Sequence, residues 1–264
     1  MKYINTNKTS KLQINKENVC IIMDFDKTIT DIKSQDSWDA SSHMLGDNCK
    51  KEMKKLYEYY APIELNYNLN FKQKEQRMIE WYTKCMNLYY KYDMTNEKMQ
   101  KSIDASNLLF RSGAKEFISK ANVENIPIII LSAGIGNVIE KFLIDNNCYS
   151  NNIFIISNFI RFDNKGKMEP FKNCEIIHSL NKTMEGHLPK EILEKIQKRK
   201  YKILVGDLCE DEKMVDEIEW ESTLKIGMLN TKIEENLKTY QKRFDIVLTE
   251  EDANLYILKE IINI

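Results

Sequence analysis

The chain has 264 residues, enough for one large α/β domain or for a core domain that carries a smaller one. Lys and Arg number 39 and Asp and Glu number 40, so the formal charge is −1 and no basic excess is available to attract a nucleic acid polymer. The six cysteines lack zinc-like spacing, and no apolar run could span a bilayer or serve as a secretory signal, so we expect a cytoplasmic, reducing location without a membrane partner.

The N-terminal part predicts a polar stretch followed by one strand. Residues 1–10 are polar and are expected to be frayed. Val19–Met23 is short, apolar and rich in β-branched residues, which is typical of a strand covered on both faces.

A helical insertion is predicted after this strand, from residue 31 to residue 112. This region is charged, aromatic and rich in helix formers, and it contains no convincing strand pattern. Helical periodicity is found at Lys50–Tyr60, Phe71–Tyr92 and Thr95–Phe110. Residues 1–30 and 113–264 would then form the core.

Strands and helices alternate after the insertion. Asn137–Asn147 predicts a helix with one apolar face, and Thr249 with Asp252 predicts a capping box ahead of a C-terminal helix. Alternation of this kind predicts an α/β fold with a doubly wound parallel sheet, covered by helices on both faces. The further predicted strands are Ile128–Leu131, Ile153–Ile156, Ile203–Val205 and, with weaker patterns, Leu224–Ile226 and Ile246–Leu248.

Two carboxylates follow the first predicted strand, in the motif Asp24–Thr28. Side chains two positions apart on an extended segment point the same way, so Asp24 and Asp26 should emerge together at the C-terminal edge of the sheet. Ligands bind at that edge in doubly wound sheets. Alone, the pair would be equally typical of a turn.

Polar groups also follow two other predicted strands. Ser132–Gly136 offers a hydroxyl and free backbone N–H groups at the start of a helix, an arrangement suited to phosphate. Asp207 and Asp211 follow the strand that ends in Val205. Because the ends of parallel strands meet at one edge, these groups are expected to surround a single site.

These motifs resemble those of the haloacid dehalogenase (HAD) superfamily of aspartyl-phosphate phosphatases. The resemblance covers Asp24–Thr28, Ser132, and Gly206-Asp207 with Asp211. Lys182, in Ile176–Lys182, lies where the superfamily carries its lysine, between the second and the last motif.

The resemblance narrows to the cytosolic pyrimidine 5'-nucleotidases and extends over nearly the whole chain. It implies a HAD-like core with a helical cap inserted after the first strand. It also implies hydrolysis of CMP and UMP to nucleoside and phosphate. The segments that carry it are Tyr59-Tyr60 with Ile63-Glu64, Glu80–Lys84, Ser132–Gly136, Ser157–Phe159, Lys225–Gly227 and Leu229-Asn230.

Two positions in the cap depart from the family pattern. Cys85 follows Trp81-Tyr82-Thr83-Lys84 where family members carry serine, and the spacing around Glu64 is one residue longer than in some of them. The resemblance implies that Glu64 accepts a hydrogen bond from the base and that Cys85 lies beside the substrate. His43, Trp81 or Tyr82 would pack against the base.

The resemblance also implies the chemistry. Mg²⁺ would be held by the carboxylates of Asp24 and Asp207 and by the backbone carbonyl of Asp26, an all-oxygen set. Asp24 would attack phosphorus, and Asp26 would protonate the leaving oxygen and then activate water. Ser132, the N–H of Ala133 and Lys182 would hold the phosphoryl oxygens.

Two residues are assigned supporting roles around this site. Asp211 would orient the metal site without taking part in the chemistry. Thr28 would steady the first motif through a local hydrogen bond.

Two other readings stay open from the sequence. A HAD phosphatase for another small monoester, such as 7-methylguanosine monophosphate or phosphoserine, would use the same four motifs with a different cap. A catalytically silent HAD-fold binding module is a further alternative, against which the intact motifs argue. The expected partner is a small nucleoside monophosphate, and the chain is expected to be a monomer.

Overall fold

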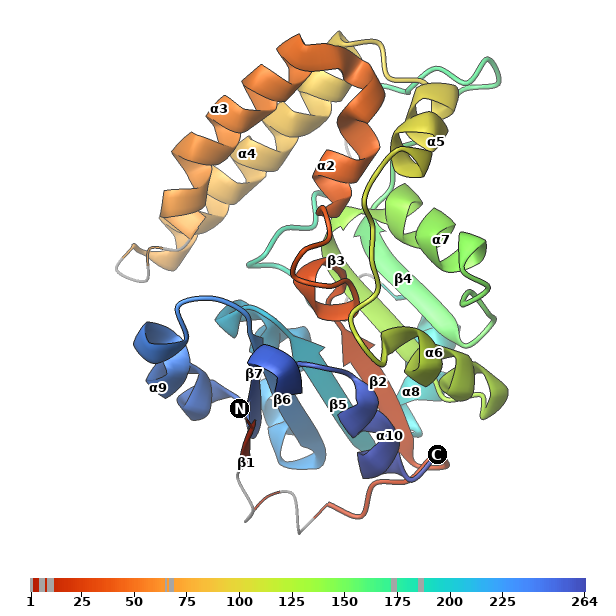
Figure 1. Ribbon diagram of the computed structural model, residues 1–264, viewed down its shortest axis with the longest axis vertical. Helices are drawn as coiled ribbons and strands as arrows, with labels where there is room; N and C mark the ends of the chain where they lie inside the picture. The colour runs from red at the N-terminus through yellow and green to blue at the C-terminus, as the bar shows by residue number, and fades with distance from the viewer. Residues whose placement is uncertain are drawn as a thin grey trace.

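The structure is a computed structural model that describes residues 2–4, 8, 12–64, 66, 69–171, 175–184 and 188–264. Within these residues the strands form one sheet in the order β1-β7-β6-β5-β2-β3-β4, in which all neighbours are parallel except β1 and β7 (Figure 1). The strands are β1 (Lys2–Ile4), β2 (Val19–Met23), β3 (Ile128–Ile135), β4 (Ile153–Asn158), β5 (Tyr201–Gly206), β6 (Thr223–Leu229) and β7 (Ile246–Thr249).

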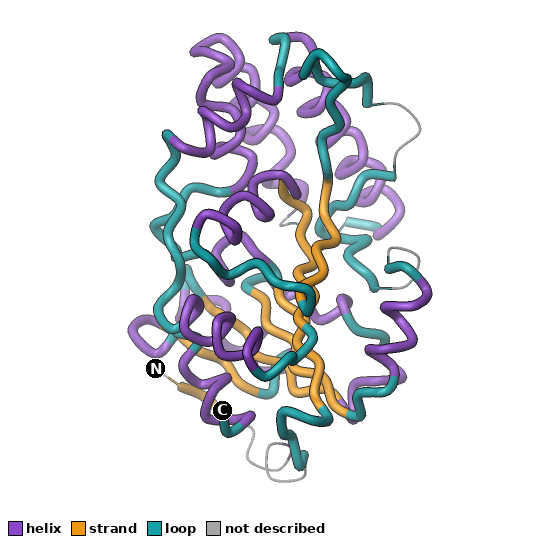
Figure 2. Tube along the Cα trace, turned by 90° about the vertical axis from the view of Figure 1, so that its right-hand side faces the viewer, coloured by secondary structure: helices purple, strands orange, loops and turns teal. Residues whose placement is uncertain are grey.

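Helices cover both faces of this sheet (Figures 1 and 2). One face packs against α6 (Ala114–Val123), α7 (Gly136–Asp145) and α10 (Tyr256–Ile262), and the other against α8 (Lys190–Gln197) and α9 (Ile233–Arg243). Residues of β2 alternate between the two apolar cores, with Ile21 in one and Ile22 in the other. This is the doubly wound α/β arrangement that the alternating pattern predicts.

The other described α-helices lie between β2 and α6 in the sequence. They are α2 (Ser37–Ser42), α3 (Gly46–Glu64), α4 (Phe71–Lys91) and α5 (Asn96–Asp104). We call α2–α5 the helical segment. It has an apolar core of its own, to which Met86, Tyr89 and Met99 contribute and which continues onto Ile135 and Val138.

The two connections between the helical segment and the sheet lie side by side. Thr30 and Phe110 form an antiparallel bridge, the Asp31 N–H donates to the Leu109 carbonyl at 2.9 Å, and the Arg111 N–H donates to the Ile29 carbonyl at 2.9 Å. The chain therefore leaves and re-enters the core at one place.

Short turns of helix complete the chain. They are η1 (Phe25–Ile29), η2 (His43–Leu45), η3 (Cys209–Met214), η4 (Glu217–Ser222) and η5 (Glu250–Asp252).

The six predicted strands and the helix that follows β3 are confirmed, with differences at both chain ends. Lys2–Ile4 is not frayed, because it pairs with β7 as an antiparallel edge strand. Within residues 5–10 only Lys8 is described, so the rest of that prediction lies outside the described residues. The capping box is wrong: Thr249 makes no side-chain capping hydrogen bond, and α10 begins later, at Tyr256.

Two further predictions concern cysteines and membranes. The five cysteines in the described part of the chain are free and buried, while Cys174 lies outside it. No described helix combines the length and the apolar character that a membrane span requires.

Candidate active site

The nucleophile candidate lies at the end of the central strand β2. Its neighbours β3 and β5 are in register, with Met23 opposite both Ile130 and Val205. The Asp24 N–H continues this pairing by donating to the Val205 carbonyl at 3.0 Å, and its side chain is 3% exposed. The chain then turns sharply through η1, where Lys27 adopts a left-handed conformation with φ of 61°. The sheet therefore fixes Asp24 before the loop begins.

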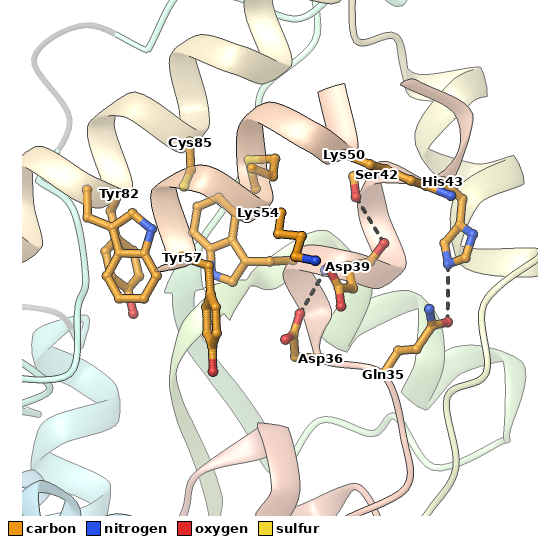
Figure 3. A pocket seen from close by; sticks show the side chains of 13 residues that line it. Gln35, Asp36, Asp39, Ser42, His43, Lys50, Lys54, Tyr57, Tyr82 and Cys85 are labelled. Carbon is orange, nitrogen blue, oxygen red and sulfur yellow. Dashed lines mark hydrogen bonds between the residues drawn. The ribbon is translucent and has the colours of Figure 1, made fainter. Parts of the chain in front are cut away.

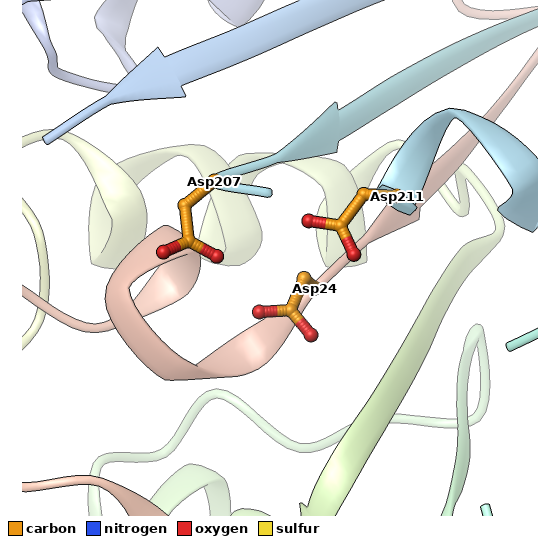
Figure 4. A group of neighbouring side chains, drawn as sticks. All are labelled: Asp24, Asp207 and Asp211. Carbon is orange, nitrogen blue, oxygen red and sulfur yellow. The ribbon is translucent and has the colours of Figure 1, made fainter. Parts of the chain in front are cut away.

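Three carboxylates converge at this point (Figure 4). One oxygen from each of Asp24, Asp207 and Asp211 lies within 4.8 Å of the others, and we call these residues the acid cluster. Gly206 makes the approach possible, because a Cβ at that position would lie 2.4 Å from Asp211 side-chain atoms. The predicted convergence of the β2 and β5 ends is present in the structure.

Lys182 pairs with two members of the acid cluster. Its Nζ lies 2.6 Å from Asp24 Oδ1 and 3.0 Å from Asp211 Oδ1, and its side chain is 5% exposed. Burial alone would lower the pKa of Lys182, but the two adjacent carboxylates raise it well above its ordinary value. The ammonium therefore stays charged beside the nucleophile candidate.

The acid cluster is short of positive charge. Burial, opposed by Lys182, raises the pKa of Asp24 to about 6, and burial and the charge of Asp24 raise that of Asp207 well above its usual range. None of the ion pairs found among the described residues includes Asp207. Carboxylate oxygens that converge with this excess of negative charge fit a hard divalent cation such as Mg²⁺.

The Asp26 carboxylate contacts the helical segment. It accepts hydrogen bonds from the Ser37 N–H at 2.9 Å and from Ser37 Oγ at 2.6 Å. Burial and the charge of Asp36 raise the pKa of Asp26 to about 8, against the effect of Ser37. A carboxyl group that keeps its proton near neutral pH has the property that a general acid needs.

The end of β3 differs in part from the prediction. Ser132 is buried, 1% exposed, and belongs to the strand next to Asp24. The nearby backbone N–H groups are not all free: that of Gly134 donates to Ser132 Oγ, and that of Ile135 donates to Ser37 Oγ, both at 3.1 Å. The Ala133 carbonyl accepts from Trp38 Nε1 at 3.2 Å. This strand end is thus bonded to the helical segment through Ser37 and Trp38.

The supporting role predicted for Thr28 is wrong. Its hydroxyl is buried and has no hydrogen-bond partner among the described residues. Thr30 stabilises the loop instead, since its Oγ1 accepts from the Lys27 N–H at 2.9 Å and donates to the Phe25 carbonyl at 3.3 Å. Asp211 Oδ2 accepts from the Leu208 N–H at 2.9 Å, and its role in orienting the metal site stays a prediction.

A cavity of about 640 Å³ lies in the helical segment (Figure 3). Four of its lining residues are Trp or Tyr, and Trp38 and Tyr82 meet edge to face with ring centroids 5.5 Å apart. His43 lines it with Nε2 3.1 Å from Gln35 Oε1, and Cys85 lines it with a thiol whose pKa burial raises to about 12. The lining includes Gln35, Asp36, Trp38, Asp39, His43, Lys50, Lys54, Tyr57, Trp81, Tyr82 and Cys85.

Glu64 is not part of this lining. It lies at the end of α3, where burial raises its pKa and the nearby charges of Lys182 and Lys74 oppose that rise. Two lining residues contact the core: Trp38 Nε1 donates to the Ala133 carbonyl, and the Tyr82 ring lies 6.4 Å from that of His178, centroid to centroid. The cavity therefore borders the end of β3, the strand next to Asp24.

Comparison with known proteins places this site in a family. The model of the pyrimidine 5'-nucleotidase (UMPH-1) family matches residues 31–264. The chain belongs to the pyrimidine 5'-nucleotidase family. It is therefore a 5'-nucleotidase, a phosphomonoester hydrolase with the HAD fold.

Relatives and solved structures agree with this membership. The 7-methylguanosine phosphate-specific 5'-nucleotidase of Homo sapiens is 32% identical over 241 residues, which are 88% of this chain and 80% of that protein. The protein of that name from Drosophila melanogaster is 30% identical over 247 residues, 90% of this chain and 77% of that protein. The crystal structure of cytosolic 5'-nucleotidase IIIB bound to cytidine has a TM-score of 0.85 at 28% identity, covering 99% of this chain and 92% of that one.

A more distant likeness bears on the fold alone. A substrate-bound phosphoserine phosphatase structure has a TM-score of 0.56 at 20% identity and covers 93% of this chain and 97% of that one. It supports the HAD architecture of this 5'-nucleotidase.

Several residues near this site were not predicted from the sequence. Ser37 and Trp38 belong to no recognised motif, and only their closeness in sequence to Asp24–Thr28 could have indicated that they lie near the site. His178 is fully buried, its Nδ1 accepts from the Leu180 N–H at 3.2 Å, and its Nε2 has no partner among the described residues. Nothing in the sequence pattern separates such groups from ordinary polar positions.

One missed contact joins the helical segment to the acid cluster. Lys74 of α4 is buried, and its Nζ lies 3.6 Å from Glu210, which stands in the loop between Asp207 and Asp211. In the short helix η3, the Lys213 Nζ lies 4.9 Å from the centroid of the Phe71 ring. Both contacts hold the start of α4 over the acid cluster.

Proposed function

We propose that this 5'-nucleotidase hydrolyses pyrimidine nucleoside 5'-monophosphates, CMP and UMP, through a phosphorylated Asp24. The observation that carries the proposal is a cavity with four aromatic side chains that borders the end of β3, the strand beside the buried Asp24–Lys182 pair. The pair suits a phosphoryl group, and flat aromatic walls suit a nucleobase. The cytidine bound to cytosolic 5'-nucleotidase IIIB is in accord with a pyrimidine leaving group.

Two domains divide this work. Residues 1–30 and 113–264 form the catalytic core, and residues 31–112 form a cap that recognises the nucleoside. The support is that the acid cluster and Lys182 belong to the first part, while all the cavity residues belong to the second. The expected monomeric state would be checked by light scattering.

Asp24 attacks phosphorus in line with the 5' oxygen and displaces the nucleoside. Lys182, Ser132 and the N–H of Ala133 hold the phosphoryl oxygens and offset the charge that builds up on them. Because Asp24 is fixed by β2 and by its contact with Lys182, it needs little reorganisation to reach the transition state.

Asp26 moves the proton in both steps. Its carboxyl group carries the proton near neutral pH and gives it to the departing 5' oxygen. The carboxylate left behind then takes a proton from water, which attacks the aspartyl phosphate and releases phosphate. For this role the Asp26 side chain must turn from Ser37 toward the substrate.

Mg²⁺ would be held by the carboxylates of Asp24 and Asp207 and by the backbone carbonyl of Asp26. When bound, it supplies positive charge that screens the phosphoryl oxygens from the attacking carboxylate. Asp211 orients Lys182 and its own loop, and both of its oxygens are engaged in those contacts.

In the cap, Trp81 and Tyr82 pack against the base, and His43 and Cys85 contact it from the cavity wall. Glu64 accepts a hydrogen bond from the base at the junction of cavity and core. The neutral Cys85 thiol is a weak donor, so a hydrogen bond at that position contributes little to binding.

A second substrate, 7-methylguanosine monophosphate, is supported by two observations. The cavity lining balances Asp36 and Asp39 against Lys50 and Lys54, and its four aromatic side chains can attract the positive charge that a 7-methylguanine base carries. The relatives in Homo sapiens and Drosophila melanogaster are named for that nucleotide. Phosphoserine has no base to fill a cavity of about 640 Å³.

The test is phosphate release from a panel of CMP, UMP, 7-methylguanosine monophosphate, GMP and phosphoserine with Mg²⁺ present. We expect the highest kcat/KM for CMP, UMP or 7-methylguanosine monophosphate and a low value for phosphoserine. Faster turnover of phosphoserine than of every nucleotide would overturn the proposal.

A further inference from the structure

Arg111 is a buried cation that the proposed chemistry does not use. It lies at the core end of the second connection to the helical segment, and it is 4% exposed. None of the ion pairs found in the described part of the chain includes it, and burial lowers the pKa of its guanidinium. Burying a guanidinium without a carboxylate is costly, so its hydrogen bonds must compensate.

The partners of Arg111 are oxygens at the active site rather than at the surface. Its Nε donates to the Thr28 carbonyl at 2.9 Å, and Nη2 donates to the Lys27 carbonyl and, at 3.0 Å, to Asn230 Oδ1. Its Nη1 donates to the Ala253 carbonyl at 2.7 Å. The planar guanidinium thus fixes the loop that begins immediately after Asp26.

Asn230 extends this network to the acid cluster. It follows β6, and its Nδ2 donates to the Lys27 carbonyl at 3.0 Å and to Asp207 Oδ2 at 3.4 Å. The amide therefore connects the loop after β2 with the acid after β5. The charge of Asp207 also acts on Arg111, since it opposes the lowering of the Arg111 pKa.

We propose that Arg111 and Asn230 are positioning residues that set the distance between the nucleophile loop and Asp207, and so determine the affinity of the acid cluster for a divalent cation. The inference rests on the proposed function, because it assigns the cation to Asp24, Asp207 and the Asp26 carbonyl. Neither residue touches the reacting atoms. Their effect passes through the backbone at Lys27 and Thr28 and through one carboxylate oxygen.

The physical basis is the cost of assembling the ligands. Asp24 and Asp207 follow different strands, β2 and β5, and their carboxylate oxygens lie within 4.8 Å of each other, so like charges have to be held close together. Without the network, the loop and Asp207 would move apart and the cation would have to bring them together. The free energy needed to order the loop and Asp207 would make cation binding less favourable by that amount.

The test is cation binding without substrate, measured by Mn²⁺ electron paramagnetic resonance and by Mg²⁺ calorimetry. We expect Asn230→Ala to weaken Mn²⁺ and Mg²⁺ binding about 10- to 100-fold, as is usual for groups that orient metal ligands. Arg111→Lys keeps the charge, but one ammonium group cannot make all the hydrogen bonds of the planar guanidinium. This variant is therefore also expected to bind both cations more weakly. Asn236→Ala and Arg161→Lys, at positions away from the acid cluster, are the matched controls.

Kinetics supply a second measurement. For Asn230→Ala, the Mg²⁺ concentration at half-maximal rate should rise, while KM for CMP at saturating Mg²⁺ should change little. Unchanged Mn²⁺ affinity in a folded Asn230→Ala protein would overturn the inference, and this variant serves even where Arg111→Lys fails to fold. If the parent protein binds Mn²⁺ but releases phosphate from no nucleotide, the proposed function fails while the binding result still decides the inference.

Discussion

The acid cluster and the cavity of the helical segment are built in different ways. The acid cluster collects residues at the ends of parallel strands, where register fixes each Cα: Met23 lies opposite Ile130 and Val205. The cavity collects side chains from α2, α3 and α4, and its shape depends on how these helices pack. In the proposed function, phosphoryl transfer takes place at the end of the sheet and the nucleoside is recognised by the helices that pack above it.

The largest expected effect lies in the acid cluster. Asp24→Asn should lower kcat by about 10⁴-fold or more, because the amide cannot form the aspartyl phosphate. Phosphate release measured with CMP and with 7-methylguanosine monophosphate should fall equally, since the lost step is common to both. Asp216→Asn, an exposed control, should keep its activity, and substantial turnover by a pure Asp24→Asn protein would refute the assigned nucleophile.

The contact between the two regions should be next in size. A Cβ at Gly134 would lie 2.0 Å from Ser37 Oγ and 2.8 Å from Asp26 Oδ2. Gly134→Ala should therefore displace Asp26 and lower kcat about 100-fold, the order of loss that a shift of about 1 Å can cause.

Gly166→Ala is the control for this substitution. A Cβ there would meet only Asn96, at 3.9 Å, although its φ of +73° adds backbone strain. A Gly134→Ala enzyme with normal kcat would mean that Asp26 does not need the observed packing.

A smaller effect is expected in the cavity. Tyr57 and Tyr59 belong to the same helix and are 62% and 58% exposed, but only Tyr57 lines the cavity. Tyr57→Leu should raise KM for CMP about 5-fold, as one aromatic contact contributes about 1 kcal/mol. Ribose 5-phosphate, which has no base, should be hydrolysed equally by parent and variant, and Tyr59→Leu should change neither substrate. An equal rise in KM for CMP and ribose 5-phosphate would show that Tyr57 does not contact the base.

The smallest effect is a shift in pH dependence. The pKa of Asp26 is raised to about 8 by burial, and the Ser37 hydroxyl opposes this by stabilising the carboxylate. Ser37→Ala removes that hydrogen bond, so the pKa of Asp26 should rise further. Because leaving-group protonation needs the acid form, the alkaline fall of kcat/KM for CMP should move to higher pH by about one unit. A shift toward lower pH would contradict the role of Asp26 as the acid.

The same contrast explains what the sequence could predict. Asp24 and Asp207 directly follow apolar strands, so strand periodicity predicted that they meet, whereas Lys182 lies outside the strands and was located by the family resemblance alone. Trp38 and Tyr57 lie on helices whose neighbours are set by long-range packing, which periodicity does not encode. Glu64 lies at the end of α3 and is absent from the cavity lining, and its hydrogen bond with the base stays a prediction.

Local hydrogen bonds were also not predictable from the sequence. Thr28 and Thr30 are both buried threonines in one turn, and only the folded structure shows that the Thr30 hydroxyl bonds the loop and the Thr28 hydroxyl does not. The early strand at Lys2–Ile4 has only three residues, too few for alternation to be recognised.

The paired connections at Thr30 and Phe110 carry a consequence for how enzymes of this shape diversify. Because the chain leaves and re-enters the core at adjacent positions, the segment between them can be replaced as one unit without changing the connections of the sheet. A chimera in which another helical unit joins residues 30 and 111 would keep the residues for phosphoryl transfer and could accept different leaving groups. Variation in substrate range can thus arise by replacing the helical segment, provided that the new unit supplies the hydrogen bonds that Ser37 gives to Asp26.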